Sequence, residues 1–312
     1  MPAIRIGTRR SALARVQTDE AIAAWRRLEP AAEFEIVELL TEGDVRADVP
    51  LDTVEGTGFF TSALERALLD HRIDVAVHSA KDLPVTSSPG LTIAALLPRA
   101  DARDALCARG GVRLRALPAG ARVGTSSPRR TAQLRALRDD LECLPLRGNV
   151  PTRLGRLARG ELDAIVLACA GLDRLGLRDR ITEVFAIEHM LPAPAQGALA
   201  VQTRAEDGWR GRMSALDHAA TRRAVETERA VLHTLRGGCS VPLGAYARVD
   251  GARIVVDAAV FAPDGGRALH ARAEGGDPRS TGEAAAQGLL ARGAAELLED
   301  VGRARPAPEP LP

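Results

Sequence analysis

Residues 122–130 read Arg-Val-Gly-Thr-Ser-Ser-Pro-Arg-Arg, and this stretch decides the fold. A short strand ends at Gly124, Ser127 is a good N-cap, and Pro128 suits the first position of a helix. The stretch therefore predicts a strand, a tight turn and a helix. The first turn of such a helix offers free N–H groups, which favour an anion. The polar side chains beside them are those of Thr125, Ser126, Ser127, Arg129 and Arg130.

The same pattern occurs near the start of the chain, where residues 5–11 read Arg-Ile-Gly-Thr-Arg-Arg-Ser. A second echo links Ile-Asp-Val-Ala-Val at 73–77 with Leu-Asp-Ala-Ile-Val at 162–166. Because the two echoes come in the same order, they predict two similarly built α/β lobes. Arg9 and Ser11 then form the first lobe's counterpart of the anion site, although capped helices with solvated arginines would look the same.

Strand and helix patterns alternate through the first part of the chain. Apolar runs predict strands at 3–7, 34–40 and 73–78, and helical spacing predicts helices at 11–25 and 62–69. This alternation favours a parallel α/β sheet.

Two segments rich in proline or glycine, Pro98–Asp104 and Leu191–Gly197, are candidate linkers. The texture then changes to that of a small α+β domain, with helices expected at 221–235 and 281–301 and strands at 243–249, 253–261 and 267–273. We expect four parts: lobe 1 at 1–97 with 198–215, lobe 2 at 103–191, a C-terminal domain at 219–302, and a disordered tail at 303–312.

The charge balance argues against a nucleic-acid partner. The 312 residues include 42 basic and 41 acidic side chains, and only 3% are aromatic. Proteins that bind nucleic acids normally show a basic excess, and single-strand binders need aromatic platforms. An arginine-rich RNA-binding protein is therefore excluded.

The N-terminus has no apolar leader, and the chain has no long apolar run. We therefore expect a cytoplasmic protein with reduced thiols and no membrane partner. The four cysteines lack zinc-site spacing, so we expect no metal.

The only lysine in the chain is Lys81. It follows the expected strand at 73–78, together with Ser79 and Asp82, at the strand end where α/β proteins bind ligands. A compact ammonium group is not interchangeable with a guanidinium fork, which singles out Lys81 in an arginine-rich chain. On spacing alone, an exposed Lys–Asp pair remains the alternative.

Two further stretches are candidates for chemistry. Arg147 and Arg153 flank a Gly-Asn-Val-Pro turn and could face one cleft, or they could be ordinary surface arginines. Cys239 follows two glycines and precedes Pro242 by three residues, which is typical of a presented thiol, although a cysteine on such a loop is more often unremarkable than catalytic. The other cysteines, Cys107, Cys143 and Cys169, lie in or beside apolar stretches and are expected to be inert.

Taken together, these motifs resemble the porphobilinogen deaminase family over nearly the whole chain, from Arg5 to about Val301. Each motif is modestly specific, but six in order are highly specific. The motifs are Arg5–Ser11, Ala76–Pro84, Val123–Arg130, Leu146–Leu154, Ala170–Leu175 and Glu228–Gly244.

The resemblance implies three domains, of which two are lobes of the periplasmic-binding-protein type with the active cleft between them. It implies a transferase that joins four porphobilinogen molecules head to tail, with loss of ammonia, and releases linear hydroxymethylbilane for tetrapyrrole and haem biosynthesis. It also implies a dipyrromethane cofactor held by a thioether. Cys239 matches the attachment cysteine and Asp82 the catalytic carboxylate. A monomer is expected on the same ground.

Other matching positions imply binding roles, because pyrrole acetates and propionates suit guanidinium forks. Asp82 would stabilise the azafulvenium-like cation left on the substrate by loss of ammonia. The implied cofactor-binding residues are Ser79, Lys81, Thr125, Ser126, Ser127, Arg129, Arg130 and Arg153. The implied substrate-binding residues are Arg9, Ser11, Arg147, Arg153, Arg174 and Gln196.

The chain departs from the family pattern at two places. Thr57 stands where many relatives carry a lysine, in a segment expected to be a mobile loop over the cleft. Ala195 stands where glycine is common, which we expect to stiffen the hinge between the lobes. A non-catalytic two-lobed module for a small dicarboxylate is the alternative function, but it leaves Cys239 and Asp82 unexplained.

The expected thioether gives a direct prediction. Purified protein should carry a covalent mass adduct on Cys239 that survives thiol reductants, and Cys239→Ser should remove both the adduct and the activity. Intact-mass and peptide mass spectrometry check this. An adduct on Cys107, Cys143 or Cys169 instead would overturn the assignment.

Overall fold

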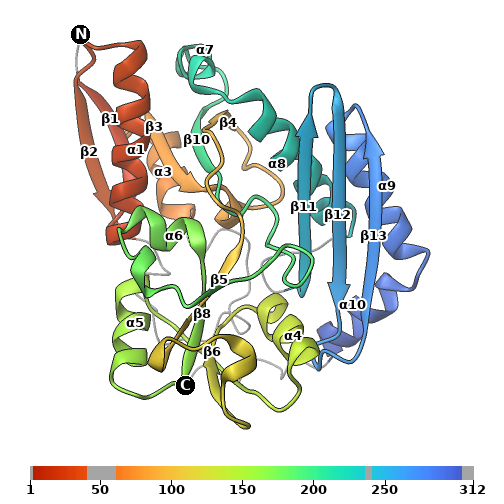
Figure 1. Ribbon diagram of the computed structural model, residues 1–312. Coiled ribbons are helices and arrows are strands. Elements are labelled where there is room, and N and C mark those ends of the chain that lie inside the picture. The colour runs from red at the N-terminus through yellow and green to blue at the C-terminus, as the bar shows by residue number, and fades with distance from the viewer. Residues whose placement is uncertain (1–2, 41–60, 236–240, 304–312) are drawn as a thin grey trace, which may run out of the picture.

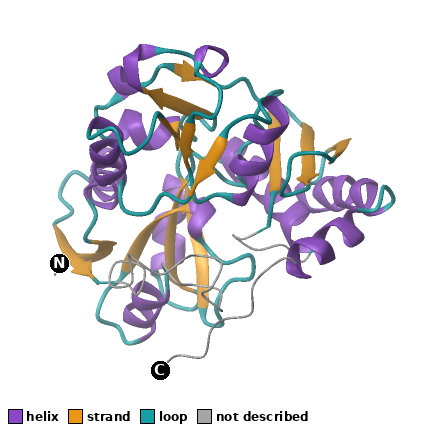
Figure 2. Ribbon diagram, turned by 90° about the horizontal axis from the view of Figure 1, so that it is seen from below, coloured by secondary structure: helices purple, strands orange, loops and turns teal. Residues whose placement is uncertain are grey.

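The computed structural model describes residues 3–40, 61–235 and 241–303. Three sheets organise the chain into two lobes and a third domain, which stand apart in Figure 1. Seen from below, each sheet has helices against it (Figure 2).

Lobe 1 contains a five-stranded sheet in the order β2-β1-β3-β10-β4. Its strands are β1 (Ile4–Arg9), β2 (Phe34–Leu39), β3 (Val75–Ser79), β4 (Leu91–Leu96) and β10 (Leu199–Arg204). Helix α1 (Ala12–Leu28) covers one face through side chains such as Ile22 and Trp25, and α3 (Ser62–Leu69) covers the other through Leu64 and Leu68. This two-sided burial explains why the strands read as apolar runs.

Lobe 2 repeats this arrangement with the order β7-β6-β8-β5-β9. Its strands are β5 (Asp104–Ala108), β6 (Arg122–Gly124), β7 (Glu142–Leu144), β8 (Ala164–Ala168) and β9 (Glu183–Val184). Its helices are α4 (Pro128–Leu137), α5 (Val150–Ala158) and α6 (Cys169–Arg174).

The two sequence echoes occupy equivalent places, since β1 matches β6 and β3 matches β8. In each lobe the arginine that opens the echo binds an aspartate beside the third strand: Arg5 binds Asp74, and Arg122 binds Asp163. The prediction of two similarly built lobes is thus confirmed down to individual hydrogen bonds.

The glycine of each echo is required by close packing. A Cβ on Gly7 would lie 2.3 Å from Ile73 Cδ1, and a Cβ on Gly124 would lie 2.6 Å from Leu162 Cδ1. Both partners are the first residue of the second echo, so the paired motifs pack against each other in each lobe.

The expectation of a parallel sheet is wrong in one respect. In each sheet the fourth strand, β10 or β5, runs antiparallel to both neighbours. The chain leaves lobe 1 after β4 through a first crossover, residues 97–103, and returns after β9 through a second crossover, residues 185–198. Each antiparallel strand is the one that enters its lobe from a crossover, a long-range feature that local alternation does not encode.

The third domain packs helices on one face of an antiparallel sheet of β11 (Leu243–Asp250), β12 (Arg253–Phe261) and β13 (Ala268–Gly275). Short α7 (Trp209–Met213) precedes this domain, and its helices are α8 (Ala219–Thr234), α9 (Pro278–Leu290) and α10 (Ala294–Arg303). The single helix expected at 281–301 is therefore two helices. The break is at Gly293, whose φ of 93° lies in the left-handed region that ends helices.

The two crossovers run close to each other, and this proximity accounts for the glycine at position 197. The other notable residue of the second linker is Ala195. Ala100 N–H donates to the Gly197 carbonyl at 3.2 Å, and a Cβ on Gly197 would lie 2.6 Å from the Ala100 oxygen. Ala195 has a φ of 63°, a left-handed conformation that costs alanine more than glycine.

Glu228 of α8 ties the third domain to both crossovers. Its fully buried carboxylate accepts hydrogen bonds from both terminal nitrogens of Arg99, at 2.6 and 3.1 Å. It also accepts from the backbone N–H of Ala195 at 2.6 Å and of Ala247 at 2.8 Å. One carboxylate thus connects the first crossover, the second crossover, α8 and β11.

Within the described ranges, no helix combines the length and the apolar character needed to cross a membrane.

We predict that Glu228→Gln strongly destabilises the protein, because it leaves the buried guanidinium of Arg99 without its counter-charge. Loss of one partner of a buried pair typically costs about 3–5 kcal/mol. Chemical denaturation measures the change. The same substitution at Glu274, in the exposed pair with Arg253, is the control and should leave the midpoint almost unchanged.

Candidate active site

The lobe 1 side of the site is built where β1 and β3 end. Arg9 is the last residue of β1, and Ser11 caps α1 by accepting a hydrogen bond from Ala14 N–H at 3.1 Å. Parallel β3 ends at Ser79 and runs into a 3₁₀ turn, Ala80–Asp82. Parallel neighbouring strands end at one edge of a sheet, so the two chain turns meet there.

A cavity at this edge brings four sequence-predicted residues together, namely Arg9, Ser11, Ser79 and Asp82. The Oγ of Ser79 accepts a hydrogen bond from Gln17 Nε2 at 2.8 Å. His78 also lines the cavity, and burial lowers the pKa of its imidazole to about 4, so it is neutral at neutral pH. The remaining lining residues are Leu13, Ala14, Gln17, Thr61 and Val77.

The third domain holds the segment that follows Asp82. Arg229 of α8 donates hydrogen bonds to the carbonyls of Leu83, Pro84 and Val85, the last at 2.9 Å. The position of the Asp82 turn therefore depends on α8 as well as on β3.

On the lobe 2 side, β6 leads into α4 as expected, with Ser127 as N-cap and Pro128 in the first turn. Ser126 Oγ donates to the Leu146 carbonyl at 2.8 Å and accepts from Leu146 N–H at 2.9 Å. Thr125 Oγ1 accepts from Ser127 N–H at 3.2 Å. These hydroxyls fix the turn that presents the start of α4.

Asp104 is the counter-ion of the two arginines at the start of α4. Its fully buried carboxylate lies 2.7 Å from Arg129 Nη1 and 2.6 Å from Arg130 Nη2. Burial alone would raise the pKa of Asp104, but the two guanidiniums hold it well below its usual range. Because two cations share one carboxylate, the cluster keeps an excess positive charge.

Gln196 links this cluster to lobe 1. Its Nε2 donates to Asp104 Oδ1 at 2.9 Å and to the Ala102 carbonyl at 2.7 Å, and its Oε1 accepts from Lys81 Nζ at 3.1 Å. The amide predicted to bind substrate is thus used, in this structure, to connect the second crossover with both lobes.

Lys81 and Arg153 carry charge that the protein only partly compensates. Burial, and then the nearby Arg130, lower the pKa of Lys81 to about 8, against the opposing pull of Asp82. Burial, Arg130 and Arg147 lower the pKa of Arg153 to about 10. A ligand with several carboxylates would relieve this repulsion.

The remaining predicted residues fall into three groups. Arg153 lies on α5 and donates to the Gly148 carbonyl at 2.8 Å, close to Arg147 in the preceding turn. Arg174 lies instead at the end of α6, where it binds Glu20 of α1. Cys239 and Thr57 lie outside the described residues.

Of the three described cysteines, Cys107 and Cys169 are buried and Cys143 is half-buried. Burial raises the pKa of Cys107 to about 11 and of Cys169 to about 12, and it also raises the pKa of Cys143. These thiols stay protonated at neutral pH, which agrees with the expectation that they are inert.

The sequence patterns did not single out Asp104 or Glu228. Asp104 stands at the end of a candidate linker, and Glu228 stands at the start of a family motif with no role of its own predicted. One signal was available for Asp104. A carboxylate that opens the wholly apolar run 105–108 is expected to be buried, and buried carboxylates have partners.

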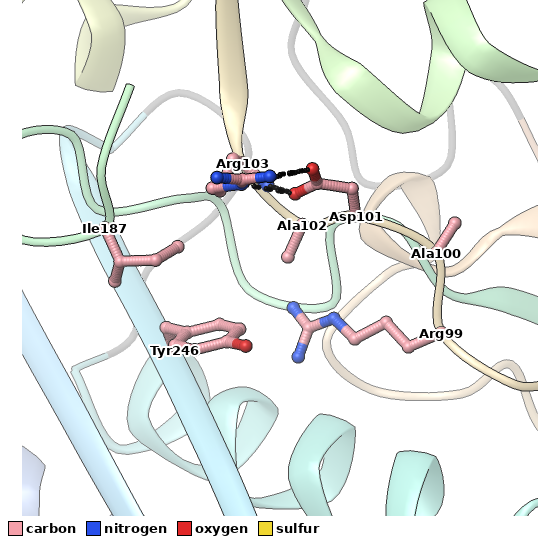
Figure 3. A pocket seen from close by; sticks show the side chains of 7 residues that line it. All are labelled: Arg99, Ala100, Asp101, Ala102, Arg103, Ile187 and Tyr246. Carbon is pink, nitrogen blue, oxygen red and sulfur yellow. Dashed lines mark hydrogen bonds and ion pairs between the residues drawn. The ribbon is translucent and has the colours of Figure 1, made fainter. Parts of the chain in front are cut away.

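A second cavity, of about 280 Å³, lies beside the first crossover between lobe 2 and β11 (Figure 3). The Arg99 guanidinium lies 5.1 Å from the centre of the Tyr246 ring, and Arg103 pairs with Asp101 at 2.7 Å. Since Arg99 is also bound to Glu228, the charges around this cavity are matched within the protein. The candidate chemistry therefore belongs to the cavity at Asp82.

Two α/β lobes joined by two crossovers, with a cavity beside Asp82, define a two-lobed α/β protein. Among solved structures, the match to the periplasmic aliphatic sulphonate binding protein from Escherichia coli covers 76% of this chain and 71% of that chain, with 15% identity and a TM-score of 0.40.

The chain belongs to the porphobilinogen deaminase family. Residues 4–210 match the family model "Porphobilinogen deaminase, dipyromethane cofactor binding domain", and residues 222–292 match "Porphobilinogen deaminase, C-terminal domain". The porphobilinogen deaminase of Acidithiobacillus ferrooxidans is 46% identical over 96% of this chain and 98% of its own. That of Brevibacillus brevis is 44% identical over 95% and 97%.

The protein is accordingly a transferase of tetrapyrrole biosynthesis. It condenses four porphobilinogen molecules, with loss of ammonia, into linear hydroxymethylbilane on a dipyrromethane cofactor. The sequence-based expectations of family, enzyme class, cofactor and overall fold class are confirmed.

The lowered pKa of Lys81 predicts a pH effect on stability. The native state binds the Lys81 proton less tightly than the unfolded chain does, so its stability relative to Lys81→Met should rise between about pH 8 and pH 10.5. We expect a rise of about 2–3 kcal/mol, since each unit of the pKa difference corresponds to about 1.4 kcal/mol. Denaturation in a cofactor-free Cys239→Ser background measures it, and a difference that does not change with pH would contradict the prediction.

Proposed function

We propose that Asp82 is the catalytic carboxylate of this enzyme and that the basic residues around it hold the carboxylates of cofactor and substrate. The observation that carries the proposal is the set of partners that Lys81 and Arg153 have near Asp82. Lys81 Nζ donates to the Gln196 amide and Arg153 Nε to the Gly148 carbonyl, and Asp82 offsets their positive charge only in part. A polycarboxylate matches this charge, whereas a neutral ligand would leave it in place.

The residues present fit dipyrromethane, whose pyrrole rings carry acetate and propionate groups. When bound, the cofactor supplies the pyrrole carbon to which the first substrate molecule is joined. We assign its carboxylates to the lobe 2 anion site and to the end of β3. The residues concerned are Ser79, Lys81, Thr125, Ser126, Ser127, Arg129, Arg130 and Arg153.

Incoming porphobilinogen and the growing chain need a second set of partners. Arg9 and Ser11 line the cavity beside Asp82, which supports a role in holding substrate carboxylates. Arg147 and Arg153 offer guanidiniums from the lobe 2 side. The full substrate set that we propose is Arg9, Ser11, Arg147, Arg153, Arg174 and Gln196.

Asp82 acts on charge that develops during the reaction. Cleavage of the C–N bond releases ammonia and leaves a cation on the substrate, which a fixed carboxylate stabilises. After the new C–C bond forms, the attacked pyrrole carbon must lose a proton, and the Asp82 carboxylate can accept it. Arg229 supports this role by holding residues 83–85 and hence the position of Asp82.

Cys239 completes the proposal as the point of thioether attachment. The flanking elements support it, because Leu235 after α8 and Val241 before β11 both pack in the core of the third domain. These two described residues on either side of Cys239 belong to the domain that also holds the Asp82 turn.

We include the domain boundaries in the proposal: 1–97 with 198–215, 103–191 and 219–302. A monomeric state and a cytoplasmic location belong to it as well. Gel filtration and cell fractionation test these last two points.

Asp82→Asn tests the catalytic assignment, because it keeps the shape of the side chain and removes its charge. We expect single-turnover condensation to slow by roughly 10²–10³-fold or more, the usual effect of losing one preorganised electrostatic group. Asp82→Glu should retain part of the activity, since its charge is displaced by one methylene.

The experiment uses protein loaded with preassembled cofactor, and mass spectrometry confirms loading through the untouched Cys239. Brief exposure to porphobilinogen should then reveal stalled species with extra pyrrole units. Wild-type condensation by loaded Asp82→Asn would show that Asp82 is structural.

A further inference from the structure

The Arg174 guanidinium joins the two lobes at a point outside the Asp82 cavity. Arg174 is the last residue of α6 in lobe 2, and its side chain is only 8% exposed. Its Nε donates to Glu20 Oε2 at 2.8 Å, and its Nη2 donates to the Gly197 carbonyl at 3.2 Å. One side chain therefore connects α6, α1 of lobe 1 and the second crossover.

The helices that carry this pair also pack directly. Gly171 of α6 faces Leu13 of α1, and a Cβ at position 171 would lie 3.6 Å from Leu13 Cδ2, an ordinary van der Waals distance. Figure 1 shows α6 next to α1. The ion pair thus adds to a packing contact between Leu13 and the face of α6 that carries Gly171.

We propose that the Glu20–Arg174 pair is a latch between the lobes and that Glu20 is a positioning residue for the condensation reaction. The proposal concerns lobe separation, so it does not depend on which residues hold the cofactor.

The position of α1 matters for the active site because its first turns form one wall of the cavity. Ser11, Leu13, Ala14 and Gln17 all line the space beside Asp82. A latch that holds α1 against α6 therefore fixes this wall relative to the lobe 2 arginines. When the latch opens, Gln196 and the crossovers still join the lobes, but the α1 wall is no longer held against α6 by the ion pair.

One partner of the latch is exposed to solvent, which allows the ion pair to break. Glu20 is 42% exposed although Arg174 is buried, so water and salt reach the carboxylate. Four condensations lengthen the product between the lobes, and the space there must change accordingly. An ion pair with one solvated partner is weak enough to break and re-form during this process.

Hydrogen–deuterium exchange of the full-length holoenzyme tests the latch. In Glu20→Gln, we expect amides of residues 169–174 and 197–198 to exchange about three to ten times faster, because this contact opens more often. Glu38→Gln is the matched control. Glu38 is 44% exposed and pairs with Arg15 of α1 inside lobe 1, so its loss should leave that exchange unchanged.

Steady-state kinetics gives a second readout that simple destabilisation does not reproduce. If fewer molecules hold the lobes in the competent arrangement, the KM for porphobilinogen should rise several-fold in Glu20→Gln while kcat stays near the wild-type value. Raising the salt concentration should bring wild-type exchange in α6 towards that of the variant, whose own exchange should respond little.

Arg174→Gln distinguishes the latch from a role in substrate binding alone. The latch predicts that Arg174→Gln and Glu20→Gln speed exchange to a similar extent and that the double variant adds little. If Glu20→Gln matches wild type in exchange and KM while Arg174→Gln loses substrate affinity, the latch is refuted and the substrate role of Arg174 stands.

Discussion

The carboxylate of Asp104 is the interaction on which the site depends. It begins β5 at the point where the chain enters lobe 2, and it neutralises part of the charge of Arg129 and Arg130. Through Gln196 it also reaches Lys81 of lobe 1. A single buried negative charge thus allows several cations to gather where we propose that a polycarboxylate binds, without cancelling the charge that attracts it.

Glu228 holds the crossovers to the third domain, much as Asp104 holds the arginines at the start of α4. Both are buried carboxylates at the junction of elements distant in sequence, and both bind arginine and a residue of the second crossover. Because Arg229 is the next residue of α8, the helix that fixes the crossovers also fixes the segment after Asp82. Two neighbouring residues of α8 therefore connect the position of the crossovers with the position of the segment after Asp82.

Features that depend on a few neighbouring residues, such as the start of a helix, could be predicted from the sequence. The N-cap at Ser127 and the proline after it predicted the start of α4, and the paired echoes predicted the likeness of the lobes. The antiparallel β5 and β10 and the partners of Arg129 and Arg174 were not predicted, since they depend on where the chain crosses between lobes. The break at Gly293 was missed because a single glycine in an alanine-rich helical pattern is often tolerated.

The two crossovers also determine which lobe can complete its sheet first during translation. Strand β10, which lies between β3 and β4 in the lobe 1 sheet, is residues 199–204, so that sheet cannot close until all of lobe 2 has been synthesised. The strands of lobe 2, by contrast, are contiguous from 104 to 184. During translation the second lobe can complete its sheet first. Until β10 is made, the β2-β1-β3 sheet has an open edge at β3, and β4 lacks its neighbour, so both are exposed to wrong pairing.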